Sequence, residues 1–142
     1  MYRRKLSGPL MDRIDIFIEV PAIKYEKLAD ESPGNQSAIL REKIKKAREI
    51  QKERFKDEIP SAGSGQAILV NSEMNIMHIK KYCRQDAASQ ALLKKYVDSG
   101  KLSARGYHRV LKVSRTIADL AGSPDILHDH VAEALMYRIK ES

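Results

Sequence analysis

The chain has 142 residues, 42% hydrophobic and 32% charged, with a formal net charge of +7. This length allows one ordinary domain that needs no disulfides, and the single cysteine, Cys83, excludes an intramolecular disulfide framework and indicates a reducing compartment. Neither a signal peptide nor an apolar run of about 20 residues is visible, so we expect a cytoplasmic protein without a membrane partner. The basic net charge is suited to binding nucleic acid or nucleotide phosphates.

The first predicted element is a strand at residues 14–20, IDIFIEV, in which aliphatic side chains alternate with charged or aromatic ones. Period-two alternation is typical of a half-buried strand, and Pro21 ends it. A single strand is not stable alone, and no later segment of the sequence predicts a convincing partner. We therefore expect this strand to be the last one of a larger sheet, and the chain to be the C-terminal part of a longer protein.

The rest of the sequence predicts a helical bundle of four or five members. Capping residues and glycines mark the helix ends, and apolar side chains recur every three or four positions. The predicted fold class is therefore mainly α, a helical bundle preceded by one strand. The expected helices cover 35–55, 71–82, 86–99, 103–121 and 128–140, with a short one at 24–29; the predicted caps are Asn35 or Ser37, Asn71 or Ser72, Asp86, Ser103, Gly100 and Gly122.

Two of these helices have a clear apolar face, which we expect to be buried. The segment 59–65 between the first two long helices, rich in Gly and Ser, is expected to be a loop. The buried faces are expected to consist of Leu40, Ile44, Ala47, Gln51 and Phe55 in the helix at 35–55, and of Tyr107, Val110, Leu111, Ser114, Ile117, Ala118 and Ala121 in the helix at 103–121.

The sequence contains no reactive constellation typical of a free-standing enzyme. There is no G-x-x-x-x-G-K-[ST] phosphate loop, since the Gly-Ser-Gly at 63–65 lacks the lysine. His128 and His130 are two positions apart, so on a helix they face different directions; we interpret them as helix-start residues, and predict no metal site. Cys83 has no base placed beside it by the sequence and is interpreted as a packed thiol.

Three cations form a stripe on the helix at 103–121. Arg105, Arg109 and Lys112 are spaced i, i+4 and i+7, opposite the apolar face. Arg105 also lies in the first turn after Ser103, where free N–H groups and the helix dipole favour an anion. The stripe is either a solvated helix face or a phosphate-recognition surface, for which planar guanidinium groups are well suited.

Arg13 lies at the base of the predicted strand and has two interpretations. It can form a surface ion pair with Asp12 or Asp15, which contributes roughly 0 to 1 kcal/mol. Alternatively, a rigid strand end can hold an arginine that reaches a nucleotide bound to a neighbouring subunit. The physical chemistry of the sequence does not choose between them.

Several long motifs resemble one known family. KLSGPLMDRIDIFIEVP, starting at Lys5, is similar to the end of the AAA+ core of the magnesium-chelatase-like ATPases, most closely their bacterial competence-protein branch. KAREIQKERF, NSEM, LSARGYHRVLKVSRTIADLAGSPDI and HVAEALMYR follow in the order of that family's C-terminal helical domain. The resemblance implies that residues 1–22 end the AAA+ core and that 23–142 form the helical lid domain of an oligomeric ring ATPase.

The resemblance also implies roles for two arginines. Arg13 matches an arginine finger that acts in trans on the neighbouring subunit's nucleotide, and Arg105 matches the sensor 2 arginine that contacts the γ-phosphate. The family's Walker A and Walker B segments would precede Tyr2, so ATP and Mg²⁺ are expected as cofactors of the full-length protein only. We expect the 142 residues alone to bind neither cofactor and to hydrolyse no ATP.

Three functions remain open from the sequence. The first is the lid and arginine-finger part of a self-associating ring ATPase that remodels DNA. The second is the ATPase subunit of a magnesium chelatase that inserts metal into a porphyrin. The third is an autonomous helical nucleic-acid-binding module with 102–121 as its recognition helix, in which Arg109 and Lys112 contact DNA or other phosphates.

Overall fold

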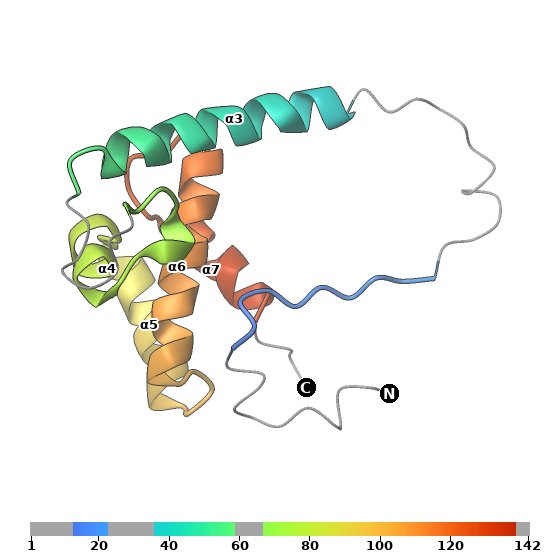
Figure 1. Cartoon of the computed structure of the whole chain (residues 1–142). Helices are drawn as coiled ribbons and strands as arrows, with labels where there is room; N and C mark the ends of the chain where they lie inside the picture. The colour runs from blue at the N-terminus through green and yellow to red at the C-terminus, as the bar shows by residue number, and fades with distance from the viewer. Residues whose placement is uncertain (1–12, 23–35, 59–66, 139–142) are drawn as a thin grey trace.

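Five α-helices and one 3₁₀ turn make up most of the described residues, 13–22, 36–58 and 67–138, of a computed structural model (Figure 1). This confirms the mainly α fold class. The predicted helix at 24–29, the cap at Asn35 and the loop at 59–65 lie outside the described residues. The elements are α3 (Gln36–Phe55), η2 (Asn71–Glu73), α4 (Ile76–Tyr82), α5 (Ala87–Asp98), α6 (Ala104–Leu120) and α7 (His128–Met136).

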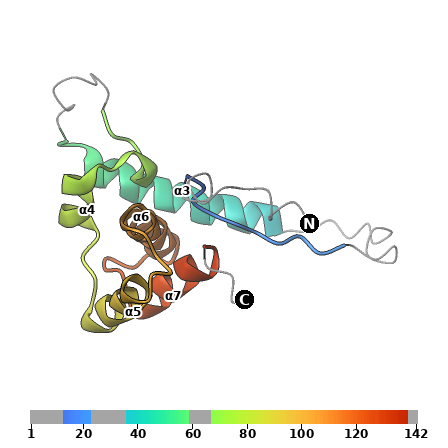
Figure 2. The same ribbon diagram turned by 90° about the horizontal axis from the view of Figure 1, so that it is seen from below.

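Helix α6 is the centre of the fold. It contacts α3, η2, α4, α5 and α7, and Figure 2, in which α6 is seen nearly end-on, shows the other helices around it. Its predicted apolar face is largely confirmed, because Val110, Leu111, Ser114 and Ala118 are buried, whereas Ala121 at the C-terminal end is exposed. The remaining core residues include Met74, Leu93, Ile126 and Val131.

The caps that bound α5 and α6 agree with the sequence predictions. Asp86 Oδ1 accepts a hydrogen bond from the Ser89 N–H at 2.8 Å, and Ser103 Oγ accepts one from the Gly106 N–H at 3.0 Å. Gly100 and Gly122 follow the two helices with φ of 70° and 69°, a conformation that side chains with a Cβ rarely adopt.

The predicted cap at Asn71 or Ser72 is wrong. Residues 71–73 form the 3₁₀ turn η2, and α4 begins at Ile76 after Asn75, whose Oδ1 accepts a hydrogen bond from the His78 N–H at 3.0 Å. Asn71 is buried, and its side chain bonds to residues of α3 and α6. A side chain used in such tertiary contacts is not available to cap its own helix.

Helix α3 buries only its C-terminal half. Ala47, Gln51 and Phe55 are buried as predicted, but Leu40 and Ile44 are 55% and 53% exposed. Figure 1 shows α3 crossing one end of α6 and extending well beyond the bundle. The prediction was therefore wrong for the N-terminal half, because that part of the helix extends beyond the bundle and its apolar side chains stay largely exposed.

Residues 14–20 are extended but do not form the predicted strand. No β-ladder exists in the described part of the chain, so this segment has no strand to pair with. Its backbone instead contacts the end of α7: the Phe17 N–H donates to the Tyr137 carbonyl at 2.7 Å, and Arg138 Nη1 donates to the Ile14 carbonyl at 2.6 Å. Without a sheet to cover them, Ile18 and Val20 are 70% and 80% exposed.

A buried polar cluster joins α3, η2 and α6. The carboxylate of Asp119, whose side chain is fully buried, accepts hydrogen bonds from Arg54 at 2.8 and 2.5 Å and from Arg115 at 3.1 Å. Asn71 donates to the same carboxylate at 2.8 Å. Arg115 also donates to the carbonyls of Ser123 and Pro124, so the α6–α7 loop is attached to the same cluster. Charges buried this way are tolerated only when paired.

A second polar contact joins the end of α3 to α4. Glu58 accepts hydrogen bonds from Lys81 Nζ at 2.8 Å and from the Tyr82 hydroxyl, and its other carboxylate oxygen lies 3.4 Å from His78 Nε2. The hydrogen bonds from Lys81 and Tyr82 lower the pKa of Glu58 to about 2. Because a carboxyl group in the unfolded chain has a pKa of about 4.3, the ionised form of Glu58 favours the folded state.

We expect the stability contributed by Glu58 to disappear in acid. The contribution is fully present above the unfolded pKa, and it is lost as the pH falls from about 4.5 towards 2, because the folded protein then takes up the proton as well. Glu58→Gln should therefore be less stable than the wild type in urea unfolding at neutral pH, and the two should converge as the pH approaches about 2. Glu53→Gln, which removes only an exposed pair with Lys56, is the control. A difference that persists unchanged into acid would contradict this account.

Among the described residues, no helix combines the length and the apolar character that crossing a lipid bilayer requires.

Candidate phosphate-binding site

The predicted basic stripe lines a pocket at the N-terminal half of α6. Arg105, Arg109 and Lys112 surround a cavity of about 320 Å³ together with His108 of the same helix. Asp15 of the N-terminal segment and Ser72 of η2 complete the lining. Because the three cations are one and two turns apart on a single helix, the structure holds them together on a rigid element. The arrangement supplies excess positive charge, which is the requirement for binding an anion.

Arg105 is the cation of this pocket that is available for a ligand. It is exposed and makes no hydrogen bond or ion pair with any residue in the described ranges. It lies in the first turn of α6, whose N-terminus Ser103 caps. The positive end of the helix dipole disfavours a cation there unless an anion is bound, so an unpaired guanidinium at this position is suited to an anionic ligand.

Arg109 and Lys112 already have partners. Arg109 Nη1 forms an ion pair with the Asp15 carboxylate. Lys112 Nζ donates to the Ser72 carbonyl at 2.8 Å. Burial lowers the pKa of Lys112, Asp15 opposes this effect and Arg109 adds to it. An anion entering the pocket would relieve the repulsion between these cations.

Gly106 allows the first turn of α6 to pack closely, a role that the sequence reasoning did not single out. It is buried, and a Cβ at this position would lie 2.9 Å from Leu102 Cδ1 and 3.3 Å from Arg138 Nε. A larger residue would force these neighbours to move. The signal was present in the sequence, because a glycine inside a strongly amphipathic helix indicates a close approach.

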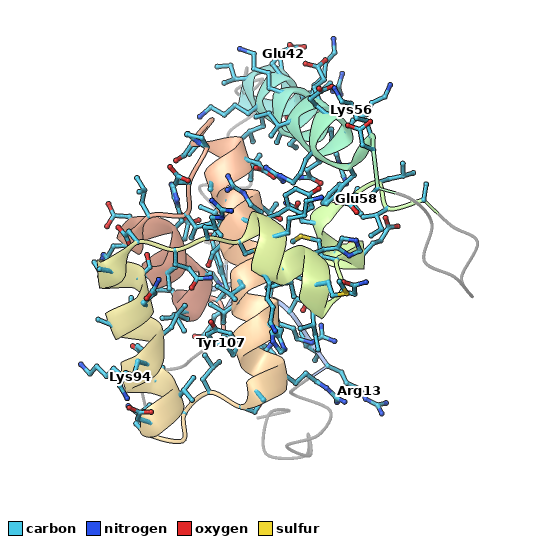
Figure 3. All side chains as sticks on the ribbon, turned by 90° about the vertical axis from the view of Figure 1, so that its left-hand side faces the viewer. Arg13, Glu42, Lys56, Glu58, Lys94 and Tyr107 are labelled. Carbon is cyan, nitrogen blue, oxygen red and sulfur yellow. The ribbon has the colours of Figure 1, made fainter. Side chains whose placement is uncertain are left out.

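Arg13 does not belong to this pocket. Its side chain is exposed and points away from the helices (Figure 3). The sequence suggested an ion pair of Arg13 with Asp12 or Asp15. The pair with Asp15 does not form, since Asp15 pairs with Arg109. Asp12 lies outside the described residues. Arg13 has no partner in the described part of the chain. The structure thus brings Arg105, Arg109 and Lys112 together and leaves Arg13 on the surface.

An apolar cavity continues from the basic pocket along α6. Its volume is about 410 Å³, and it shares Asp15, Ser72 and Lys112 with the basic pocket. The sequence reasoning did not identify this cavity, because its two walls come from segments far apart in the chain. Its apolar lining comes from Ile16, Ile18, Val113, Ile117, Leu120 and Tyr137.

The remaining candidates from the sequence have structural roles. His128 and His130 begin α7 and have separate partners: His128 lies 3.2 Å from Asp129, and His130 Nδ1 accepts from the Leu127 N–H at 3.1 Å. Cys83 is buried in the core, where burial raises the pKa of its thiol to about 12, so it is a packed residue and not a nucleophile. The described residues contain no cluster of His, Cys, Asp or Glu that could hold a metal ion.

Comparison with known proteins identifies the same two regions that the motifs suggested. Residues 34–138 match the family described as magnesium chelatase, subunit ChlI C-terminal, and residues 1–28 match the one described as magnesium chelatase, subunit ChlI. The resemblance inferred from the sequence is therefore confirmed. The division at residue 22 between core and lid stays a prediction.

Curated relatives cover nearly the whole chain. The chain is 43% identical over 138 residues to competence protein ComM of Haemophilus influenzae and 31% identical over 138 residues to the uncharacterized protein YifB of Escherichia coli. It is 32% identical over 139 residues to an uncharacterized protein of Mycobacterium tuberculosis. Each match covers 96% of this chain but only 25% of the relative. The chain, with its arginine-bearing helix α6, belongs to the magnesium chelatase ChlI C-terminal family.

Proposed function

We propose that this chain carries the arginine finger and the sensor 2 arginine of a cytoplasmic, ring-forming ATPase that couples ATP hydrolysis to the remodelling of DNA. The main support is Arg105, which lies at the start of α6 in a pocket with Arg109 and Lys112. Its guanidinium group has no partner among the described residues. Family membership and the greater length of the relatives support a nucleotide-binding core outside these 142 residues. In this proposal Arg13 is the arginine finger.

The pocket residues fit the phosphates of a nucleotide. Two guanidinium groups and one ammonium group line a cavity of about 320 Å³, and such groups are the usual protein ligands of phosphate oxygens. In our proposal ATP supplies the transferable phosphoryl group and Mg²⁺ neutralises part of its charge. The described residues provide cations for the phosphates, and in our proposal the ligands for Mg²⁺ come from the nucleotide-binding core.

Each arginine has a distinct task in this proposal. Arg105 binds the terminal phosphate and, being on the central helix of the bundle, moves with the whole lid when that phosphate leaves. Arg13 enters the neighbouring subunit's site and stabilises negative charge on the transferring group. Both tasks require a permanent positive charge held in place before the reaction, because preorganised charge costs no reorganisation at the transition state.

DNA is the substrate that we favour. The chain is basic, with a net charge of +7, and its relative from Haemophilus influenzae is named a competence protein. The names of the two matched families favour a chelatase subunit instead. The ATPase rate of the ring-forming protein separates the two: we expect stimulation by DNA and none by a porphyrin with a chelatase partner subunit. The opposite pattern would assign the chelatase function.

The effect of Arg105 is testable in the ring-forming protein. We expect Arg105→Ala to lower kcat roughly 10²- to 10³-fold, the usual cost of removing one preorganised charge-stabilising donor. Arg105→Lys should recover only part of the rate, because an ammonium group cannot form the two-pronged contact of a guanidinium. Steady-state ATPase assays measure both, with Arg84→Ala, an exposed arginine outside the pocket, as the control. Unchanged kinetics for Arg105→Ala would remove Arg105 from the nucleotide site and refute the proposal.

A further inference from the structure

The basic pocket contains a carboxylate of the chain itself. Asp15 pairs with Arg109, and it is the sole acidic residue among the described residues that line the cavity. Arg109 lies one helical turn from Arg105 on the basic stripe. The side chains of Asp15 and Arg109 are 49% and 27% exposed, so the pair is accessible to solvent and contributes little stability.

We propose that Asp15 is a built-in competitor for the phosphate site: its carboxylate holds Arg109 until the terminal phosphate of a nucleoside triphosphate displaces it. The inference rests on the proposed function, since it concerns the same pocket. It adds a residue that neither the resemblance nor the stripe suggested.

Charge and geometry favour the exchange. A terminal phosphate carries more negative charge and more acceptor oxygens than a carboxylate, so it binds two guanidinium groups better. Once it bridges Arg105 and Arg109, the nearby carboxylate of Asp15 is repelled, because both anions occupy a cavity of only about 320 Å³. Asp15 leaves easily, since its pair with Arg109 is exposed and, in the described part of the chain, it forms no hydrogen bond or ion pair with another side chain.

Displacement of Asp15 would connect the two functional arginines. Asp15 is two residues from Arg13 and belongs to the segment 13–22, which contacts the end of α7 through Ile14 and Phe17. The Asp15–Arg109 pair is an ion pair between this segment and the phosphate pocket. Nucleotide bound at Arg105 would therefore loosen the segment that carries Arg13. In a ring, nucleotide bound to one subunit would thereby change the position of the Arg13 that this subunit supplies to its neighbour's site.

The 142-residue chain alone is not expected to hold ATP, but we expect its basic pocket to bind an isolated polyphosphate weakly. The test therefore titrates tripolyphosphate to high concentration at low ionic strength and measures binding by calorimetry. Asp15→Asn keeps the shape of the side chain and removes its charge, so we expect it to bind tripolyphosphate about 3- to 10-fold more tightly than the wild type, the effect of removing one nearby like charge that water screens almost fully. Asp125→Asn changes the net charge equally but lies outside the pocket, and should bind like the wild type.

A second measurement follows the segment itself. The amide of Phe17 is hydrogen-bonded to the Tyr137 carbonyl at 2.7 Å, so its hydrogen exchange reports whether the segment is held. We expect saturating tripolyphosphate to accelerate this exchange in the wild type, and Asp15→Asn to exchange fast without the ligand. Slower or unchanged exchange in the wild type on addition of tripolyphosphate would overturn the proposal.

The outcomes separate the inference from the function on which it rests. If Arg105→Ala abolishes tripolyphosphate binding while Asp15→Asn binds like the wild type or more weakly, the phosphate site is right and the competitor role is wrong. If Arg105→Ala binds like the wild type, the phosphate site itself is refuted. A single-stranded oligonucleotide that displaces tripolyphosphate, and binds more tightly than it at equal ionic strength, would instead assign the pocket to nucleic acid and overturn both.

Discussion

Replacing Arg13 by alanine in the proposed ring-forming ATPase is expected to lower ATP turnover about 10³- to 10⁵-fold, the range measured for arginine fingers. Nucleotide binding should stay close to the wild-type value, because Arg13 is exposed and does not line the pocket of Arg105, and in our proposal it acts on the site of another subunit. Single-turnover hydrolysis and nucleotide titration measure the two quantities separately. Arg84→Ala, which removes another exposed arginine, is the matched control.

Mixed rings test whether Arg13 acts in trans. When wild-type and Arg13→Ala subunits assemble together, each mutant subunit should inactivate its neighbour's site, so activity should fall faster than the fraction of wild-type subunits. Activity that follows this fraction linearly would place Arg13 in its own subunit's site. Unchanged activity of the uniform mutant would show that Arg13 is an ordinary surface residue.

Replacing Asp119 by alanine is expected to destabilise the helical domain by about 3 to 5 kcal/mol, the usual cost of removing one partner from a buried ion pair. Asp119 is buried between Arg54 of α3 and Arg115 of its own helix. Burial lowers the pKa of Arg115, and Asp119 is the main group that opposes this effect. Without the carboxylate, two guanidinium groups would remain close together with little solvent.

Urea unfolding at neutral pH measures this loss of stability. Asp98→Ala is the control, because Asp98 forms an exposed pair with Lys94 within α5 and its removal should cost at most about 1 kcal/mol. A simultaneous replacement of Arg54, Arg115 and Asp119 by apolar residues should recover part of the lost stability, since no charge is then left unpaired. A loss below about 1 kcal/mol for Asp119→Ala would show that the cluster is solvated and not a buried clamp.

Short-range features of the fold could be predicted from the sequence. Asp86 and Ser103 cap the helices that follow them, and Gly100 and Gly122 end α5 and α6, because each of these interactions involves residues within one turn. The apolar face of α6 is equally local in origin, since it follows from the helical period. The spacing of Arg105, Arg109 and Lys112 on that helix was enough to predict that they share a face.

Long-range contacts could not be predicted in this way. Asn71 was expected to cap a helix, but it is buried against Arg54, which lies 17 residues away in the chain, and Asp119. Residues 14–20 have the alternation of a strand, yet the described residues contain no strand that could pair with them. Both predictions were wrong, because the local pattern does not show what lies opposite that residue or segment in space.

The sequence by itself thus determined the long helices, the caps of α5 and α6, the family and the face on which the cations lie. The tertiary structure decided which charges are paired: Asp119 joins Arg54 across 65 residues, and Asp15 joins Arg109 across 94, whereas Arg105 has no partner in the described part of the chain. The physical reason is the separation along the chain over which each interaction acts. Helix periodicity and capping act over one turn, whereas the burial and pairing of a charge depend on segments that only folding brings together.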